Sequence, residues 1–190
     1  MTHDQLLLAI KGLQSHVESM ASYAQSEQAA KQSLVLPVLS ALGYNALDLT
    51  EVVPEFRADV FQTKGARVDY AILKDNVPII LIECKPVETE LSDQIAKQLY
   101  KYFISTEARV GVLTNGLHYR FYTDLDKPNK MDSTPFLKID IVNDSPEKIT
   151  DWLQLLTKPN FEIRSIQNFA KRNGSSTFSV GLPILIAYWI

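Results

Sequence analysis

The sequence contains a single cysteine, Cys84, among its 190 residues. One thiol cannot form a disulfide within the chain, which excludes a disulfide-stabilised extracellular scaffold. The first residues also lack the basic stretch and cleavage site of a signal peptide, so we expect a cytoplasmic protein. The chain has only three histidines, His3, His16 and His118, and their spacing fits no zinc site.

Basic residues are no more abundant than acidic ones. Lys and Arg total 19 against 22 Asp and Glu, which gives a formal net charge of −3. Non-specific nucleic-acid binders usually carry a basic excess, because neutralisation of phosphates supplies most of their affinity. We therefore expect any nucleic acid to meet local basic patches, metal ions or the charge of a partner protein.

Long hydrophobic runs are absent as well. The apolar residues 178–190 are interrupted by Gly181 and Pro183 and are too short to span a bilayer, so we predict no membrane association. This tail could dock on the domain, form an interface or be an accident of the reading frame, and the sequence leaves these choices open.

The composition, 46% hydrophobic and 22% charged, is typical of a globular protein. We predict one domain at 1–145 and a C-terminal helical extension with an apolar tail at 146–190.

Hydrophobic periodicity predicts an α/β domain in which helices flank a mixed central β-sheet. A helix begins after the N-cap Ser26, either tolerates Pro37 or kinks there, and ends at Gly43. The predicted helices are 4–20, 26–42, 92–105 and a peripheral helical region at 146–172. The predicted strands are 47–61 at an edge, 67–73, 77–85, 110–114 parallel to 77–85, 118–122 and 136–142.

The residues that indicate chemistry stand at the end of the most apolar strand. Glu83 and Lys85 terminate residues 77–85, a segment in which charged side chains are rare unless they have a function. Because side chains alternate along a strand, Glu83 and Lys85 point to one face and Cys84 to the other.

Asp69, in the preceding strand, joins Glu83 only if the register allows it. If residues 74–76 form a three-residue loop, Asp69 lies opposite Leu81, on the same face as Glu83 and one diagonal step away. A two-residue loop would place Asp69 on the other face.

Two carboxylates that converge at a strand end repel each other unless a cation lies between them. Their hard oxygen atoms suit Mg²⁺ or Mn²⁺. Such an ion would lower the pKa of a bound water and neutralise the charge that grows on a phosphate during phosphodiester hydrolysis. Lys85, with an ordinary pKa of about 10.4, would be protonated and act first as an electrostatic stabiliser.

Asp69 followed by Glu83-Cys84-Lys85 at the end of an apolar strand resembles the signature of the PD-(D/E)xK nuclease superfamily. The E-x-K tripeptide is common by chance. Its combination with a strand, an upstream Asp and a downstream Q-x-x-x-Y element is much more specific.

That downstream element is Gln98 to Tyr102, which resembles the Q-x-x-x-Y motif of type I restriction enzyme R subunits and RecB-like nucleases. Residues 26–44 are similar to the opening of the R-subunit N-terminal domain, where a helical glutamate flanks the site; here it is Glu27. The resemblance covers roughly residues 22–142.

The resemblance implies a restriction-endonuclease-like core and a metal-dependent DNA endonuclease. The implied ligands of Mg²⁺ or Mn²⁺ are Asp69, Glu83 and the backbone carbonyl of Cys84, and the implied catalytic lysine is Lys85. Val68 stands where the signature has a proline, a common departure.

Three further residues have implied accessory roles. Gln98 and Tyr102 would position DNA or stabilise the site, and Glu27 would be an accessory acid. The implied partner is DNA, with other restriction-system subunits or a second copy of the chain left open. R subunits continue into a helicase motor, whereas this sequence has no G-x-x-x-x-G-K-[ST] loop.

Each of these residues also has a purely structural interpretation. Glu83 and Lys85 could be a solvated strand end, and Cys84 a buried small hydrophobe. Glu27 could form an ordinary surface ion pair with Lys31 four residues later. Asp69 could be an ordinary acid that forms a salt bridge with Arg67. Gln98 and Tyr102 could belong to a polar helix face. The alternative function is a catalytically inert nucleic-acid-binding or assembly module with the same fold.

Overall fold

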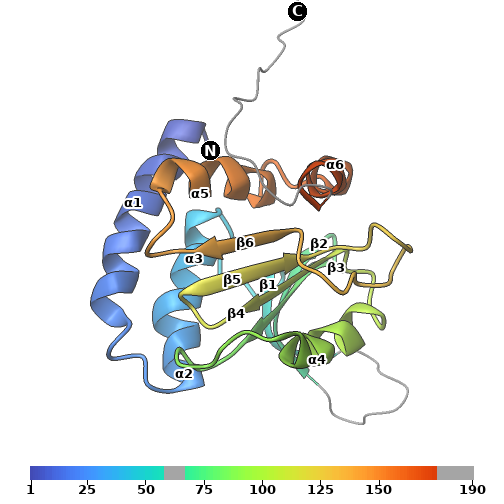
Figure 1. The fold of residues 1–190 in the computed structure, drawn as a ribbon, viewed down its shortest axis with the longest axis horizontal. Coiled ribbons are helices and arrows are strands. Elements are labelled where there is room, and N and C mark those ends of the chain that lie inside the picture. The colour runs from blue at the N-terminus through green and yellow to red at the C-terminus, as the bar shows by residue number, and fades with distance from the viewer. Residues whose placement is uncertain (58–66, 175–190) are drawn as a thin grey trace, which may run out of the picture.

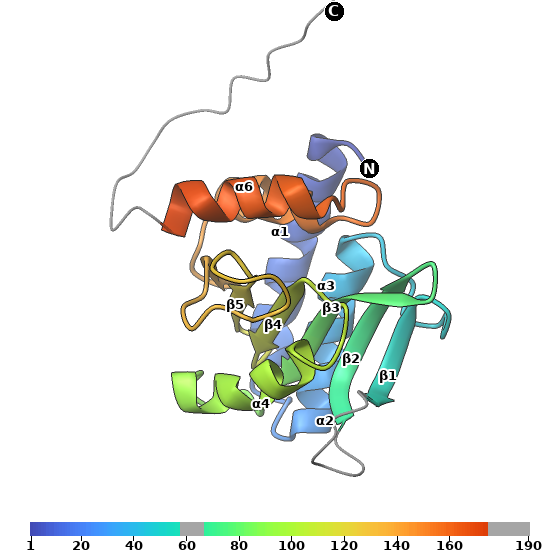
Figure 2. The same ribbon diagram turned by 90° about the vertical axis from the view of Figure 1, so that its right-hand side faces the viewer.

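The computed structural model describes residues 1–57 and 67–174. A six-stranded mixed sheet lies at the centre, with its strands in sequence order and helices on both faces (Figures 1 and 2). Only the β3–β4 pair is parallel; the other four neighbouring pairs are antiparallel. The predicted mixed α/β sheet is confirmed. The strands are β1 Val52–Arg57, β2 Arg67–Lys74, β3 Val77–Cys84, β4 Val110–Thr114, β5 His118–Tyr122 and β6 Leu137–Asp140.

Two hydrophobic clusters cover the two faces of the sheet. The larger cluster packs five α-helices, a π-helical turn and a 3₁₀ turn onto one face, and the smaller one packs α4 onto the other (Figure 1). The helical segments are α1 His3–Met20, α2 Glu27–Ala30, the π-helical η1 Lys31–Val35, α3 Leu36–Ala41, α4 Asp93–Phe103, α5 Pro146–Leu153, the 3₁₀ turn η2 Gln154–Leu156 and α6 Ile163–Gly174.

The segment after Ser26 forms three consecutive helical pieces. The Ser26 hydroxyl accepts a hydrogen bond from the Ala29 N–H and caps α2. A π-helical turn, η1, lies just before Pro37, which cannot donate a backbone hydrogen bond to a regular helix. Gly43, with φ of +89°, follows the last turn, as predicted for a helix end.

The predicted domain boundary near residue 145 remains a prediction. Helix α5 contributes Ile149 and Leu153 to the larger cluster, and α6 contributes Ile166, so both helices share the main core. The apolar tail predicted at 178–190 lies outside the described residues. No helix among the described residues has the length and hydropathy needed to cross a membrane.

The hairpin between β2 and β3 corrects the predicted register. Asp75 and Asn76, both with positive φ, form a two-residue turn instead of the expected three-residue loop. That change alone would turn Asp69 to the wrong face. The register shifts between Ile72 and Leu73, however, and this irregularity restores the alternation. Beyond the shift, Tyr70 pairs with Ile82. Asp69 therefore lies beside Glu83, whereas the prediction placed it opposite Leu81.

Candidate active site

Glu83 is a buried carboxylate at the end of the central strand β3, only 2% exposed. Its Oε1 accepts a hydrogen bond of 2.7 Å from Lys85 Nζ, while its Oε2 is buried without a hydrogen-bond partner among the described residues. Burial raises the pKa of Glu83 to about 7; Lys85 opposes this shift and the charge of Asp69 adds to it. An additional cation beside Oε2 would compensate the buried charge.

Asp69 connects three parts of the molecule through one carboxylate. Its Oδ2 accepts a hydrogen bond of 2.6 Å from the backbone N–H of Cys84 in β3. Its Oδ1 accepts a hydrogen bond from the Lys31 ammonium of η1. Both oxygens are thereby oriented, and Asp69 is held close to the end of the strand that carries Glu83.

Lys85 follows β3 and faces both Glu83 and α4. Its Nζ is 2.7 Å from Glu83 Oε1 and 3.4 Å from the side-chain oxygen of Gln98. Burial acts to lower the pKa of Lys85, but the hydrogen bond and charge of Glu83 outweigh it and raise the pKa above its ordinary value. Lys85 therefore carries a positive charge at neutral pH, which suits an electrostatic role.

Lys31 is the residue that the sequence interpretation underestimated. Its side chain is buried and contacts three carboxylates: Glu27 at 3.2 Å, Glu55 at 3.6 Å, and Asp69. Burial acts to lower its pKa, but Asp69 and Glu27 outweigh this effect and raise it. The available signal was its place among apolar helix positions such as Leu34, where an unpaired lysine would be costly.

Glu55 was not predicted as a site residue. The β1–β2 register pairs Pro54 with Tyr70 and Phe56 with Val68, which sets Glu55 beside Asp69. Its φ of 50° lies in the left-handed region, which non-glycine residues seldom occupy.

The remaining predicted residues occupy different environments. Gln98 is exposed and reaches Lys85, whereas Tyr102, on the same helix, is buried in the smaller core cluster. The Cys84 side chain is buried in the larger cluster, where burial raises the pKa of its thiol. Glu27 is half-exposed and bonded to a buried lysine, so its pair with Lys31 differs from an ordinary surface ion pair.

Divalent ions fit the donors at the end of β3. The unpartnered Oε2 of Glu83 and the carboxylate of Asp69 are hard oxygen atoms of the kind that Mg²⁺ and Mn²⁺ prefer. With the Lys31 ammonium among Glu27, Glu55 and Asp69, no group of three or more His, Cys, Asp or Glu side chains within 1–57 and 67–174 is arranged to hold a metal ion. The predicted ligand set contains two side chains and one backbone carbonyl.

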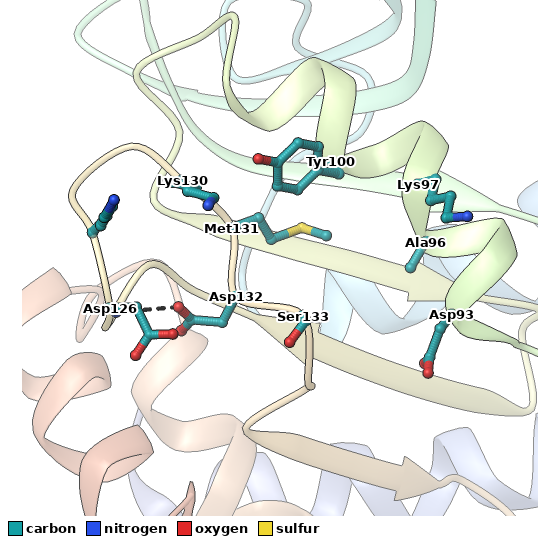
Figure 3. Close-up of a pocket in the computed structure, with 10 residues that line it drawn as sticks. Asp93, Ala96, Lys97, Tyr100, Asp126, Lys130, Met131, Asp132 and Ser133 are labelled. Atoms are coloured by element: carbon teal, nitrogen blue, oxygen red, sulfur yellow. Dashed lines mark hydrogen bonds between the residues drawn. The ribbon is translucent and has the colours of Figure 1, made fainter.

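A separate pocket of about 450 Å³ lies between α4 and the loop before β6 (Figure 3). Lys97 and Tyr100 face it from the helix, while Lys127 and Lys130 face it from the loop. Successive residues of a helix are rotated by about 100° about its axis. The residues of α4 that face the pocket and Gln98 therefore lie on opposite flanks of the buried face of the helix.

The six-stranded mixed sheet, covered by helices on both faces and carrying acidic residues at the end of β3, defines an α/β domain with a restriction-endonuclease-like core. Residues 26–137 match the family described as the type I restriction enzyme R protein N terminus (HSDR_N). This match covers more than half of the chain, which therefore belongs to that family.

One solved structure with a similar fold is a chain of a DrdV–DNA complex determined by cryo-electron microscopy. The two chains are 14% identical, and the match covers 82% of this chain and 99% of that chain with a TM-score of 0.56. At this identity the likeness shows the fold alone. No curated protein matches the chain.

Proposed function

We propose that this chain is a metal-dependent DNA endonuclease domain that hydrolyses phosphodiester bonds. The observation that carries the proposal is the Glu83 carboxylate. A charged group buried at a strand end is costly, and one of its oxygens has no partner among the described residues. Asp69 beside it supplies a second oxygen ligand of the same kind.

Each residue has a defined role in the proposed site. Asp69, Glu83 and the carbonyl of Cys84 would hold Mg²⁺ or Mn²⁺, which supplies a water of lowered pKa and neutralises phosphate charge. Lys85 is held by Glu83 and Gln98 with its positive charge at the same strand end, where it would stabilise the negative charge that develops on the phosphate. Gln98 orients the Lys85 ammonium.

Three lysines, Lys97, Lys127 and Lys130, line the pocket beside α4 together with three aspartates, Asp93, Asp126 and Asp132. Lys127 and Lys130 are exposed, and in the view of Figure 3 Tyr100 lies between Lys130 and Lys97. Asp132, which also lines the pocket, accepts hydrogen bonds from the backbone N–H groups of Leu125 and Asp126, so its charge is partly compensated. We propose that these lysines contact phosphates, and that restriction-system subunits supply the additional positive charge that the balanced pocket lining lacks.

Cleavage of a supercoiled plasmid tests the proposal. The full chain with Mg²⁺ or Mn²⁺ should nick or linearise the plasmid, and EDTA should stop the reaction. Asp69→Asn, Glu83→Gln and Lys85→Met should each reduce the rate at least about 100-fold while circular dichroism shows an intact fold.

Glu88→Gln is the matched control, because Glu88 is an exposed acid in the loop that follows the site. Its cleavage rate should equal that of the wild type. Full activity of the three site variants would refute the assignment. Binding of DNA without cleavage under any divalent ion would instead identify an inert nucleic-acid-binding module.

A further inference from the structure

The carboxylate cluster of Glu27, Glu55 and Asp69 surrounds a positively charged side chain of the protein itself, Lys31. The Lys31 ammonium lies within 3.6 Å of Glu27 and Glu55 and is hydrogen-bonded to Asp69. These three acids come from α2, β1 and β2, so the lysine joins separate elements at one point. Its side chain is only 8% exposed, which limits screening by water.

Lys31 and strand β3 bind different oxygens of Asp69. The lysine bonds Oδ1 of Asp69, whereas Oδ2 is bonded to the Cys84 N–H of the strand that carries Glu83. The Glu83 oxygen that lacks a partner is therefore served by neither Lys31 nor Lys85. One position for a divalent ion remains next to Glu83, while the acids on the Lys31 side already surround a positive charge.

Without Lys31, the other side of the cluster would have an uncompensated charge. Glu27, Glu55 and Asp69 would meet with three negative charges and no cation among them, an arrangement that repels itself or takes up a metal ion. Glu55 adopts its left-handed backbone conformation at this point, and its carboxylate contacts Lys31.

We propose that Lys31 is a positioning residue that fixes Asp69 and takes the place of a second divalent ion, so that the site binds a single metal. The inference rests on the proposed metal-dependent function. Lys31 acts through Asp69.

Metal stoichiometry tests this inference independently of cleavage. Titration of the full chain with Mn²⁺, followed by calorimetry and by the electron paramagnetic resonance signal of free Mn²⁺, should show one ion per wild-type chain. Lys31→Met should bind two ions, because the three acids become available as ligands. Lys31→Arg, which keeps the charge, should return to one.

A second variant assigns the additional ion to the cluster. Lys31→Met combined with Glu27→Gln and Glu55→Gln removes the repulsion together with two of the new ligands, and should bind one ion. This combined variant also shows whether the fold tolerates loss of the lysine. If Lys31→Met alone does not fold without metal, Lys31→Met with Glu27→Gln replaces it in the titration, and two ions are again expected.

The outcomes separate the two proposals. Two ions in the wild type, or one ion in every Lys31 variant, would overturn the role of Lys31 and leave the proposed nuclease function intact. No bound ion in the wild type or in any variant would overturn both.

Discussion

Lys31 and Asp69 form a buried ion pair between residues 38 positions apart, one in the π-helical turn η1 and the other in strand β2. The pair joins the N-terminal helical segment to the sheet close to the end of β3, which carries Glu83. It therefore links the stability of the fold to the geometry of the proposed site.

Replacement of Lys31 should lower the stability of the fold. Lys31→Met leaves Asp69 buried without its cation, and we expect the free energy of unfolding to fall by about 3 kcal/mol. Lys11→Met is the control, because it breaks only the exposed pair with Glu147 and should cost less than about 1 kcal/mol. Urea denaturation in EDTA measures both values, and equal losses would show that burial of Lys31 contributes nothing.

Glu83 should make the metal-free protein less stable as the pH rises. Its pKa is about 7 in the folded state against 4.5 for an ordinary glutamate. Between these values the folded state binds more protons than the unfolded state, so the free energy of unfolding falls with increasing pH. Below pH 4.5 Glu83 contributes nothing, and above pH 7 its full cost is present.

Glu83→Gln removes this ionisation. In EDTA the variant should be more stable than the wild type at pH 8, by on the order of 2 kcal/mol, and nearly equal to it at pH 5. Denaturation at both pH values checks the difference. A variant that is less stable at pH 8 would mean that the ionised carboxylate stabilises the fold.

Divalent ions should reverse the cost of ionised Glu83. At 100 times the dissociation constant, bound Mg²⁺ or Mn²⁺ should raise the free energy of unfolding by about 2.7 kcal/mol. The rise should be larger at pH 8 than at pH 6, because protons compete for Glu83. Thermal denaturation should show it in the wild type and in Glu88→Gln. Persistence of the rise in both Asp69→Asn and Glu83→Gln would place the ion elsewhere.

Gln98 should matter for cleavage and little for folding. It is exposed and its side-chain oxygen faces Lys85, so Gln98→Ala should slow plasmid cleavage about tenfold and leave the metal-induced stabilisation unchanged. Gln94→Ala is the control on the same helix, since the Gln94 side chain accepts a hydrogen bond from the exposed Lys97. Equal rates for the two variants would remove Gln98 from the proposed site.

Gly116 should be required for the packing of η1 on the sheet. It has φ of +90°, and a Cβ there would lie 2.7 Å from Leu34. Gly116→Ala should therefore destabilise the fold by about 2 kcal/mol or more. Gly12→Ala, in α1 with open space around it, should be neutral or stabilise by up to about 1 kcal/mol. Denaturation of the two variants gives a direct comparison.

Local patterns in the sequence were enough for most of the fold. Helical periodicity, the Ser26 cap, the Gly43 helix end and the apolar run of β3 are properties of neighbouring residues, and the structure contains each of them. The likeness of Asp69 and Glu83 to a nuclease signature also depends only on residue type and spacing.

Tertiary structure decided how the acids meet and which cation they share. The turn at Asp75 has two residues instead of three, and only the compensating irregularity in β2–β3 pairing brings Asp69 beside Glu83. In the sequence, Lys31 has the spacing of an ordinary surface ion pair with Glu27. Its contacts with Glu55 and Asp69 cannot be read there, because they form only when helix and sheet pack together. Short-range preferences determine helices and strands, whereas register and burial depend on residues distant in the chain, and those set the charge balance of this site.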